Sequence, residues 1–144
     1  MARVSTYLNF QGQSEEALGY YRDLFDGTIV GQTVRYRDMP IPDGPELSPA
    51  DGEKMMHMEV EIVAGHVLMA TDMLESMDQH VRIGNNTTIA VEVDGREEVD
   101  RIFAGLAAGQ EQSEPAVMPW GQYWCTCLDR FGIRWMFNCP TAQA

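Results

Sequence analysis

The chain has 144 residues, which is enough for one compact domain over 1–144 with a core of its own. Its 10 Lys and Arg against 22 Asp and Glu give a net charge of −12, which repels phosphate backbones and anionic membrane surfaces. The first residues lack the pattern of a signal peptide, and no apolar stretch approaches the ~18 residues of a membrane span. We therefore expect no nucleic-acid partner, no membrane contact and a cytoplasmic protein.

The first half of the chain predicts a strand, a helix and three further strands. The run STYLNF precedes a helical pattern at 14–25, which Ser14 can cap and Gly27 can stop. The three strand-like runs that follow are TIVGQTVRY at 28–36, KMMHMEVEIV at 54–63 and HVLMATD at 66–72. Between them, the segment 38–54 has four prolines and no periodicity, so we expect a long exposed loop. Loops of this length are more often lids, partner contacts or mobile inserts than tight connections.

The second half repeats this order. A strand-like run, TTIAVEV, precedes a helical pattern at 94–109 that Asp94 can cap. At least two strands follow, QYWCTCL and IRWMFNC. The helices superpose at a shift of 82 residues and the last strands at a shift of 67, which pairs Met69 with Met136. We therefore predict a duplication, with module one at about 1–74, a connector at about 75–86 and module two at about 87–140.

The cysteines predict neither a disulfide framework nor a zinc site. Their count of three is odd, so at least one thiol stays unpaired. Cys125 and Cys127 would share one face of a strand, but no second Cys or His pair completes a zinc site. We expect buried thiols that act as small apolar side chains.

With these elements in order, the chain resembles the glyoxalase, bleomycin-resistance and extradiol-dioxygenase superfamily, also called vicinal oxygen chelate proteins. The resemblance rests on YLNFQGQSEEALGYYRDLF, KMMHMEVEIVAGHVLMATD, EEVDRIFAGLAAG and MPWGQYWCTCLDRFGIRWMFNC, which together cover most of the chain. Within the superfamily it is most similar to the PhnB-like branch, often labelled 3-demethylubiquinone-9 3-methyltransferase-like. This resemblance implies an α+β fold in which paired βαβββ modules curl a mixed sheet around a cleft, with helices outside. It also implies a homodimer.

The resemblance also locates the metal ligands of other members, which come from the first and last strands of each module. On this sequence those positions are Ser5 or Thr6, Thr88, Met69 and Met136. A hard divalent ion prefers imidazole nitrogen or carboxylate oxygen, whereas thioethers suit soft copper(I). We therefore expect no metal and no cofactor.

Strand alternation indicates which other side chains line the cleft, because residues two apart share a face. The predicted helix-facing residues are Met56, Met58, Val60, Ile62, Ile133, Trp135 and Phe137. The predicted cleft-facing residues are His57, Glu59, Glu61, Arg134, Met136 and Asn138. The cleft would then hold a histidine, carboxylates, an arginine and thioethers.

A small polar or carbonyl-bearing ligand is expected to contact His57 and Glu59, with His57 as the best candidate for a proton acceptor. Arg134 would hold an anionic group. Trp120, in a Trp-Gly pair before a cleft strand, either stacks on the ligand or only plugs the end of the barrel. The predicted ligand-binding residues are His57, Glu59, Met69, Trp120, Arg134 and Met136. A purely structural alternative, in which His57 bonds a neighbouring strand and the glutamates are solvated, stays open; His66 and His80 are given no role.

Three classes of function remain open. The first is a sequestering protein whose acidic cleft captures a cationic compound without a metal. The second is a metal-independent enzyme that uses His57 as a base, and the third is a metal-dependent lyase or dioxygenase with unorthodox ligands such as His57, Glu59 and Glu61. Methyl transfer is not expected, because the chain lacks the glycine-rich turn with which doubly wound folds bind S-adenosylmethionine.

Overall fold

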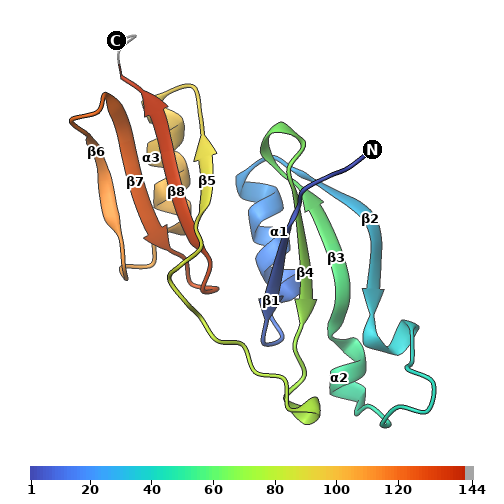
Figure 1. Ribbon diagram of the computed structural model, residues 1–144. Helices are drawn as coiled ribbons and strands as arrows, with labels where there is room; N and C mark the ends of the chain where they lie inside the picture. Colours follow the sequence, from blue (N-terminus) through green and yellow to red (C-terminus); the bar gives the residue numbers. More distant parts are fainter. Residues whose placement is uncertain (142–144) are drawn as a thin grey trace. The chain divides into compact units, whose positions relative to one another are not determined.

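Two βαβββ modules make up the computed structural model, which describes residues 1–141 (Figure 1). The chain divides into two units, Met1–Arg82 and Ile83–Ala144, and this division falls inside the expected connector at 75–86. Each unit has a four-stranded sheet of its own, in the orders β1-β4-β3-β2 and β5-β8-β7-β6. The predicted α+β fold of paired βαβββ modules is confirmed.

The first unit folds one helix onto a mixed sheet. Its elements are β1 (Thr6–Phe10), α1 (Ser14–Leu24), β2 (Thr28–Arg35), α2 (Pro49–Glu53), β3 (Met55–Glu61) and β4 (Val67–Asp72), with 3-10 turns at Tyr36–Asp38, Val63–Gly65 and Glu75–Met77. β4 pairs parallel with β1 and antiparallel with β3, and β3 pairs antiparallel with β2. α1 contacts β3 and β4, and Leu18 and Tyr21 of the helix are buried, as are Val60 and Leu68 of the sheet. The opposite face of this sheet carries no helix of the unit, and we call it the open face.

The predicted helix-facing stripe of β3 is right at Met58, Val60 and Ile62, which are buried, but wrong at Met56. Met55 is buried instead, with 1% of its surface exposed. The pairing of β3 with β2 shifts register at this point. Such an irregularity breaks the two-residue alternation, so the buried position moves by one residue.

The predicted helix caps are also wrong. The N-cap residue of α1 is Gln13, not Ser14, and the Ser14 backbone N–H instead donates a hydrogen bond of 2.9 Å to the Asp72 carboxylate. α3 begins after Gly95, without a side-chain cap from Asp94. The carboxylate of Asp72 therefore does for α1 what a capping side chain normally does.

The segment 38–54 is not a structureless loop throughout. It ends in the short helix α2, whose N-cap Ser48 accepts a hydrogen bond of 3.1 Å from the Asp51 backbone N–H. The segment between Met39 and Leu47 stays irregular and largely exposed.

The second unit repeats the first. Its elements are β5 (Ile89–Glu92), α3 (Arg96–Leu106), β6 (Ser113–Val117), β7 (Gln122–Leu128) and β8 (Arg134–Pro140). As predicted for the last strand, Trp135 and Phe137 are fully buried and contribute to the core, whereas Ile133 is only half-buried. All three cysteines are free and buried, as expected. Over residues 1–141, no helix combines the length and apolar character needed to cross a membrane.

Candidate functional site

A row of four side chains crosses the open face of the first sheet. Tyr7 of β1 pairs with Met69 of β4, Met69 pairs with Glu59 of β3, and Glu59 pairs with Val30 of β2. Directly paired residues project to the same side of a sheet. The structure therefore brings the predicted residues Glu59 and Met69 together, and Tyr7 lies on the other side of Met69.

His57 stands next to this row and is bonded to it. Its Nε2 lies 3.0 Å from Glu59 Oε1, and its ring lies 6.4 Å from the Tyr7 ring at an interplanar angle of 35°. The two side chains are two residues apart on one strand, so they share the open face. The structure thus brings three predicted residues, His57, Glu59 and Met69, into one cluster.

The Glu59 carboxylate is the most enclosed charge of this cluster, with only 12% of its side chain exposed. The guanidinium of Arg3, which is itself well exposed, approaches Glu59 Oε1 at 3.8 Å. Because the carboxylate is partly removed from water, its attraction for a nearby cation is screened less than on an open surface.

Gly31 makes the space that the carboxylate occupies. It lies at an irregularity in β2, between Val30 and Val34, and has a φ of +63°. A Cβ at this position would lie 2.7 Å from Glu59 Oε2, inside contact distance. Glycine therefore serves both the left-handed backbone and the close approach of the Glu59 side chain.

The strand register places the expected first-strand metal positions away from Met69. Thr6 pairs with Leu68 on the helix side of the sheet, and its Oγ1 lies 2.8 Å from His66 Nε2, a contact that gives His66 a structural partner. The residue opposite Met69 is Tyr7, and neither Ser5 nor Thr6, the expected first-strand positions, is paired with Met69.

The donor atoms at these positions do not fit a hard divalent ion. In the second unit the residue opposite Met136 is Ala90, and Thr88 lies just outside β5. The two strand pairs thus offer a phenol, two thioethers and a methyl group, with neither imidazole nor carboxylate. Within residues 1–141, no three His, Cys, Asp or Glu side chains are grouped as metal ligands would be.

The remaining predicted residues belong to the second unit. Met136 and Arg134 lie on the sheet face opposite the buried Trp135. The Arg134 guanidinium donates to the Gly84 carbonyl at 3.1 Å and forms an ion pair with Glu111, so its charge is already compensated. Trp120 is 62% exposed at the turn between β6 and β7 and contacts Trp124 edge-on, with ring centroids 6.0 Å apart.

Comparison with known proteins places the chain in a family. The family model described as 3-demethylubiquinone-9 3-methyltransferase matches residues 2–137. The chain belongs to this family. The expected 3-demethylubiquinone-9 3-methyltransferase-like label is thereby confirmed, and the expected glyoxalase-type fold is shared with solved structures.

Solved structures agree with this assignment. Protein PA1353 from Pseudomonas aeruginosa superposes with a TM-score of 0.77 at 27% identity, over 97% of this chain and 98% of that one. The PhnB protein from Bacillus cereus gives 0.65 at 24% identity, over 96% and 99% of the two chains. A glyoxalase/bleomycin resistance protein/dioxygenase from Nocardioides gives 0.54 at 18% identity, over 100% and 87%. The last two similarities show the shared fold alone.

Sequence reasoning missed three members of the cluster: Tyr7, Arg3 and Gly31. Tyr7 carries a usable signal, because alternation in STYLNF puts it on the face opposite Leu8 and Phe10. Arg3 lies before the first strand, where no periodicity applies. The role of Gly31 depends on the irregular pairing of β2 with β3, which leaves no local pattern.

Proposed function

We propose that this family member binds a small organic cation on the open face of its first sheet, without a bound metal. The observation that carries the proposal is the Glu59 carboxylate, which is 12% exposed and bonded to His57. A partly buried carboxylate is stabilised by a positive partner and by hydrogen-bond donors. In the free protein His57 and the exposed Arg3 are its neighbours, and the proposed organic cation takes the place of the loosely held Arg3 guanidinium.

The surroundings of Glu59 favour an aromatic or flexible cation over an anion. Tyr7 presents a half-exposed ring, to which a cation can bind through the ring face. Met69 adds a polarisable thioether that adapts to the shape of a ligand. The guanidinium of Arg3 already lies within ion-pair distance of Glu59. A ligand with a guanidinium or amidinium group could therefore displace Arg3 and bind the carboxylate in its place.

Metal independence is part of this proposal and is supported by the side chains themselves. Tyr7 and Met69 in one unit, and Ala90 and Met136 in the other, replace the ligand types that a divalent ion prefers. Elemental analysis of tag-free protein purified without chelator tests this directly. A stoichiometric amount of zinc, nickel or iron would contradict the proposal and favour a metal enzyme with unorthodox ligands.

Binding is proposed in place of methyl transfer, although the family description names a methyltransferase. Both sheets are four-stranded and mixed, and in each unit the three strands that follow the first helix belong to the same sheet as the strand before it. The usual S-adenosylmethionine site instead lies at the carboxyl ends of a doubly wound parallel sheet, next to a glycine-rich turn.

Benzamidine, a flat aromatic amidinium, is a suitable probe for this site. Calorimetric titration should show saturable binding to the wild-type protein. Glu59→Gln should weaken it by about ten- to a hundredfold, the range expected for a lost charged hydrogen bond of about 1.5–3 kcal/mol. Glu61→Gln is the matched control, because Glu61 is exposed on the same strand and bears the same charge. Equal effects of the two variants would contradict a specific site at Glu59.

A metal-independent enzyme is the second candidate, because the pairing of His57 with Glu59 favours it. A carboxylate that accepts from Nε2–H leaves Nδ1 as a proton acceptor. His57→Ala separates the two functions. If the protein only sequesters, benzamidine capture should survive and no compound in a carbonyl-substrate screen should be consumed by the wild type. If the wild type consumes a compound that the variant binds but does not convert, the enzyme is favoured.

The anion-holding role of Arg134, the stacking role of Trp120 and the homodimer stay predictions. Analytical ultracentrifugation tests the homodimer, which should sediment at about twice the mass of the 16.2 kDa chain. A monomer at all accessible concentrations would contradict it. The cytoplasmic location also stays a prediction.

A further inference from the structure

A pocket of about 460 Å³ lies in the first unit, between the 3-10 turn Tyr36–Asp38 and helix α2. Its volume is within the range of about 300–1,000 Å³ that is typical of small-molecule sites. The irregular segment between Pro40 and Leu47 forms much of its lining. We infer that this pocket is a binding site for an uncharged aromatic molecule, separate from the cluster around Glu59.

Hydrogen bonds hold the walls of the pocket in place. The Tyr36 hydroxyl donates to the backbone carbonyl of Asp72 at 2.7 Å, which fixes the tyrosine ring at the end of β4. Asp51 of α2 accepts from Ser76 Oγ at 2.7 Å and from Lys54 Nζ at 2.9 Å. The turn and α2, which form one side of the pocket, are therefore held in place before a ligand binds, which lowers the entropy cost of binding on that side.

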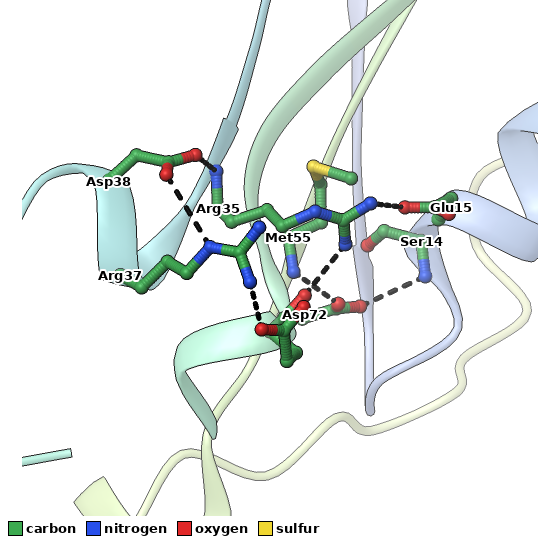
Figure 2. Close-up of polar contacts among 8 residues, drawn as sticks. Ser14, Glu15, Arg35, Arg37, Asp38, Met55 and Asp72 are labelled. Atoms are coloured by element: carbon green, nitrogen blue, oxygen red, sulfur yellow. Dashed lines mark hydrogen bonds and ion pairs between the residues drawn. The ribbon is translucent and has the colours of Figure 1, made fainter. Parts of the chain in front are cut away.

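Two arginines tie the turn beside the pocket to the rest of the unit. Figure 2 shows Arg35 reaching Glu15 of α1, while its backbone N–H donates to Asp38 at 2.9 Å. Arg37 reaches Asp38 at 3.7 Å and also forms an ion pair with Glu53 of α2. These contacts connect the turn, α1 and α2, so the two ends of the irregular segment are fixed to the rest of the unit.

The lining is mostly apolar. Ile41 is 54% exposed although it is a large aliphatic residue, and Leu47 is half-buried beside it. Three further lining residues are Pro40, Pro45 and Pro49. Proline has no backbone N–H, so these positions offer carbonyl acceptors but cannot bind an anion through the backbone.

The charges around the pocket also exclude an anion. Arg37 is the single cationic side chain of the lining, and Glu53 and Asp38 already neutralise it. Glu46 adds a second carboxylate to the lining. An anionic ligand would be repelled by the net negative charge of the lining. An uncharged aromatic ring, by contrast, gains free energy when it moves from water to contact with apolar side chains.

Indole and its anionic analogue indole-2-carboxylate test the inference. Titrations followed by ligand-observed NMR should show saturable indole binding, and indole-2-carboxylate should bind at least tenfold more weakly. Leu47→Asp should weaken indole binding at least tenfold, because it places a charge in the apolar wall. Val117→Asp is the matched control, since Val117 is an exposed aliphatic residue of the second unit. Ile41→Asp, on the exposed rim, replaces Leu47→Asp if that variant does not fold.

Several results would overturn the inference. They are non-saturable indole binding, unchanged binding in both pocket variants, and tighter binding of the carboxylate than of indole. A wild-type dimer that Leu47→Asp converts to a monomer would overturn it as well, since the pocket would then be an interface between copies. The two proposals are tested independently. Glu59→Gln should leave indole binding unchanged, and Leu47→Asp should leave benzamidine binding unchanged.

Discussion

Replacing Asp72 with Ala tests how the first sheet is held to its helix. The Asp72 side chain is 2% exposed, and its two oxygens accept backbone N–H groups from Ser14 at 2.9 Å and from Met55 at 2.8 Å (Figure 2). The substitution leaves two buried N–H groups without an acceptor, at about 1–3 kcal/mol each. We therefore expect the free energy of unfolding to fall by about 2–6 kcal/mol, a large share of the ~5–15 kcal/mol typical of a domain.

Urea denaturation followed by circular dichroism measures this loss. Asp72→Asn should fall between the wild type and Asp72→Ala, because the amide oxygen can still accept from one of the two N–H groups. Asp23→Ala is the control; Asp23 is an exposed residue of α1, and its replacement should change stability by no more than about 0.5 kcal/mol. A loss below about 1 kcal/mol for Asp72→Ala would refute the reasoning, since two buried donors would then have found other partners.

Three further predictions concern stability and reactivity. Gly27→Ala should destabilise the protein by about 1–3 kcal/mol, because the new Cβ would lie 2.3 Å from a backbone carbonyl oxygen of β3. Gly19→Ala, inside α1 with no neighbouring atom within 4 Å of the new Cβ, should stabilise it by about 0.5–1 kcal/mol. Urea midpoints that shift in the same direction for both variants would contradict this. Burial raises the pKa of the Cys125 thiol to about 11 and that of Cys127 to about 12, so iodoacetamide at neutral pH should leave both unmodified in the native protein but alkylate them in urea, as mass spectrometry can show; rapid native labelling would disprove it. Hydrogen bonds from the Ser76 hydroxyl and the Lys54 ammonium lower the pKa of Asp51 below 3.8. The ionised carboxylate therefore stabilises the fold above that pH, and this stabilisation is lost as the pH falls through the folded-state pKa. The difference in urea midpoint between the wild type and Asp51→Asn should narrow from pH 6 to pH 3, and a difference that widens would contradict a lowered pKa.

The two-residue alternation of strands was sufficient to place the main site residues. It put His57 and Glu59 on the face opposite Met58 and Val60, as the structure has them. It failed at Met55, because an irregular pairing with β2 moves the buried position by one residue. Such irregularities depend on the neighbouring strand and leave no mark in a single strand.

Contacts between distant residues were the part that the sequence could not supply. Ser14 looked like a helix cap, but the group that satisfies the helix end is Asp72, which is 58 residues away. The pairing of Tyr7 with Met69 is parallel, and no tight turn links the two strands to set their register. Tyr7 was therefore overlooked as a member of the cluster around Met69.

The pocket beside α2 was equally hidden. The prolines of 38–54 correctly indicated an irregular segment, but they say nothing of the wall that Tyr36 provides through its bond to Asp72. A loop becomes a site only when distant side chains fix its ends, and this is a property of the folded chain.

We propose above that an organic cation binds beside Glu59 on the open face of the first sheet. The most direct test is a titration of benzamidine into protein labelled with ¹³C at its methionine methyl groups. Met69, which pairs with Glu59, should show a saturable shift that disappears in Glu59→Gln, whereas Met58, buried beneath α1, should not move. Saturable benzamidine binding with an unmoved Met69 methyl would place the ligand elsewhere and contradict the account.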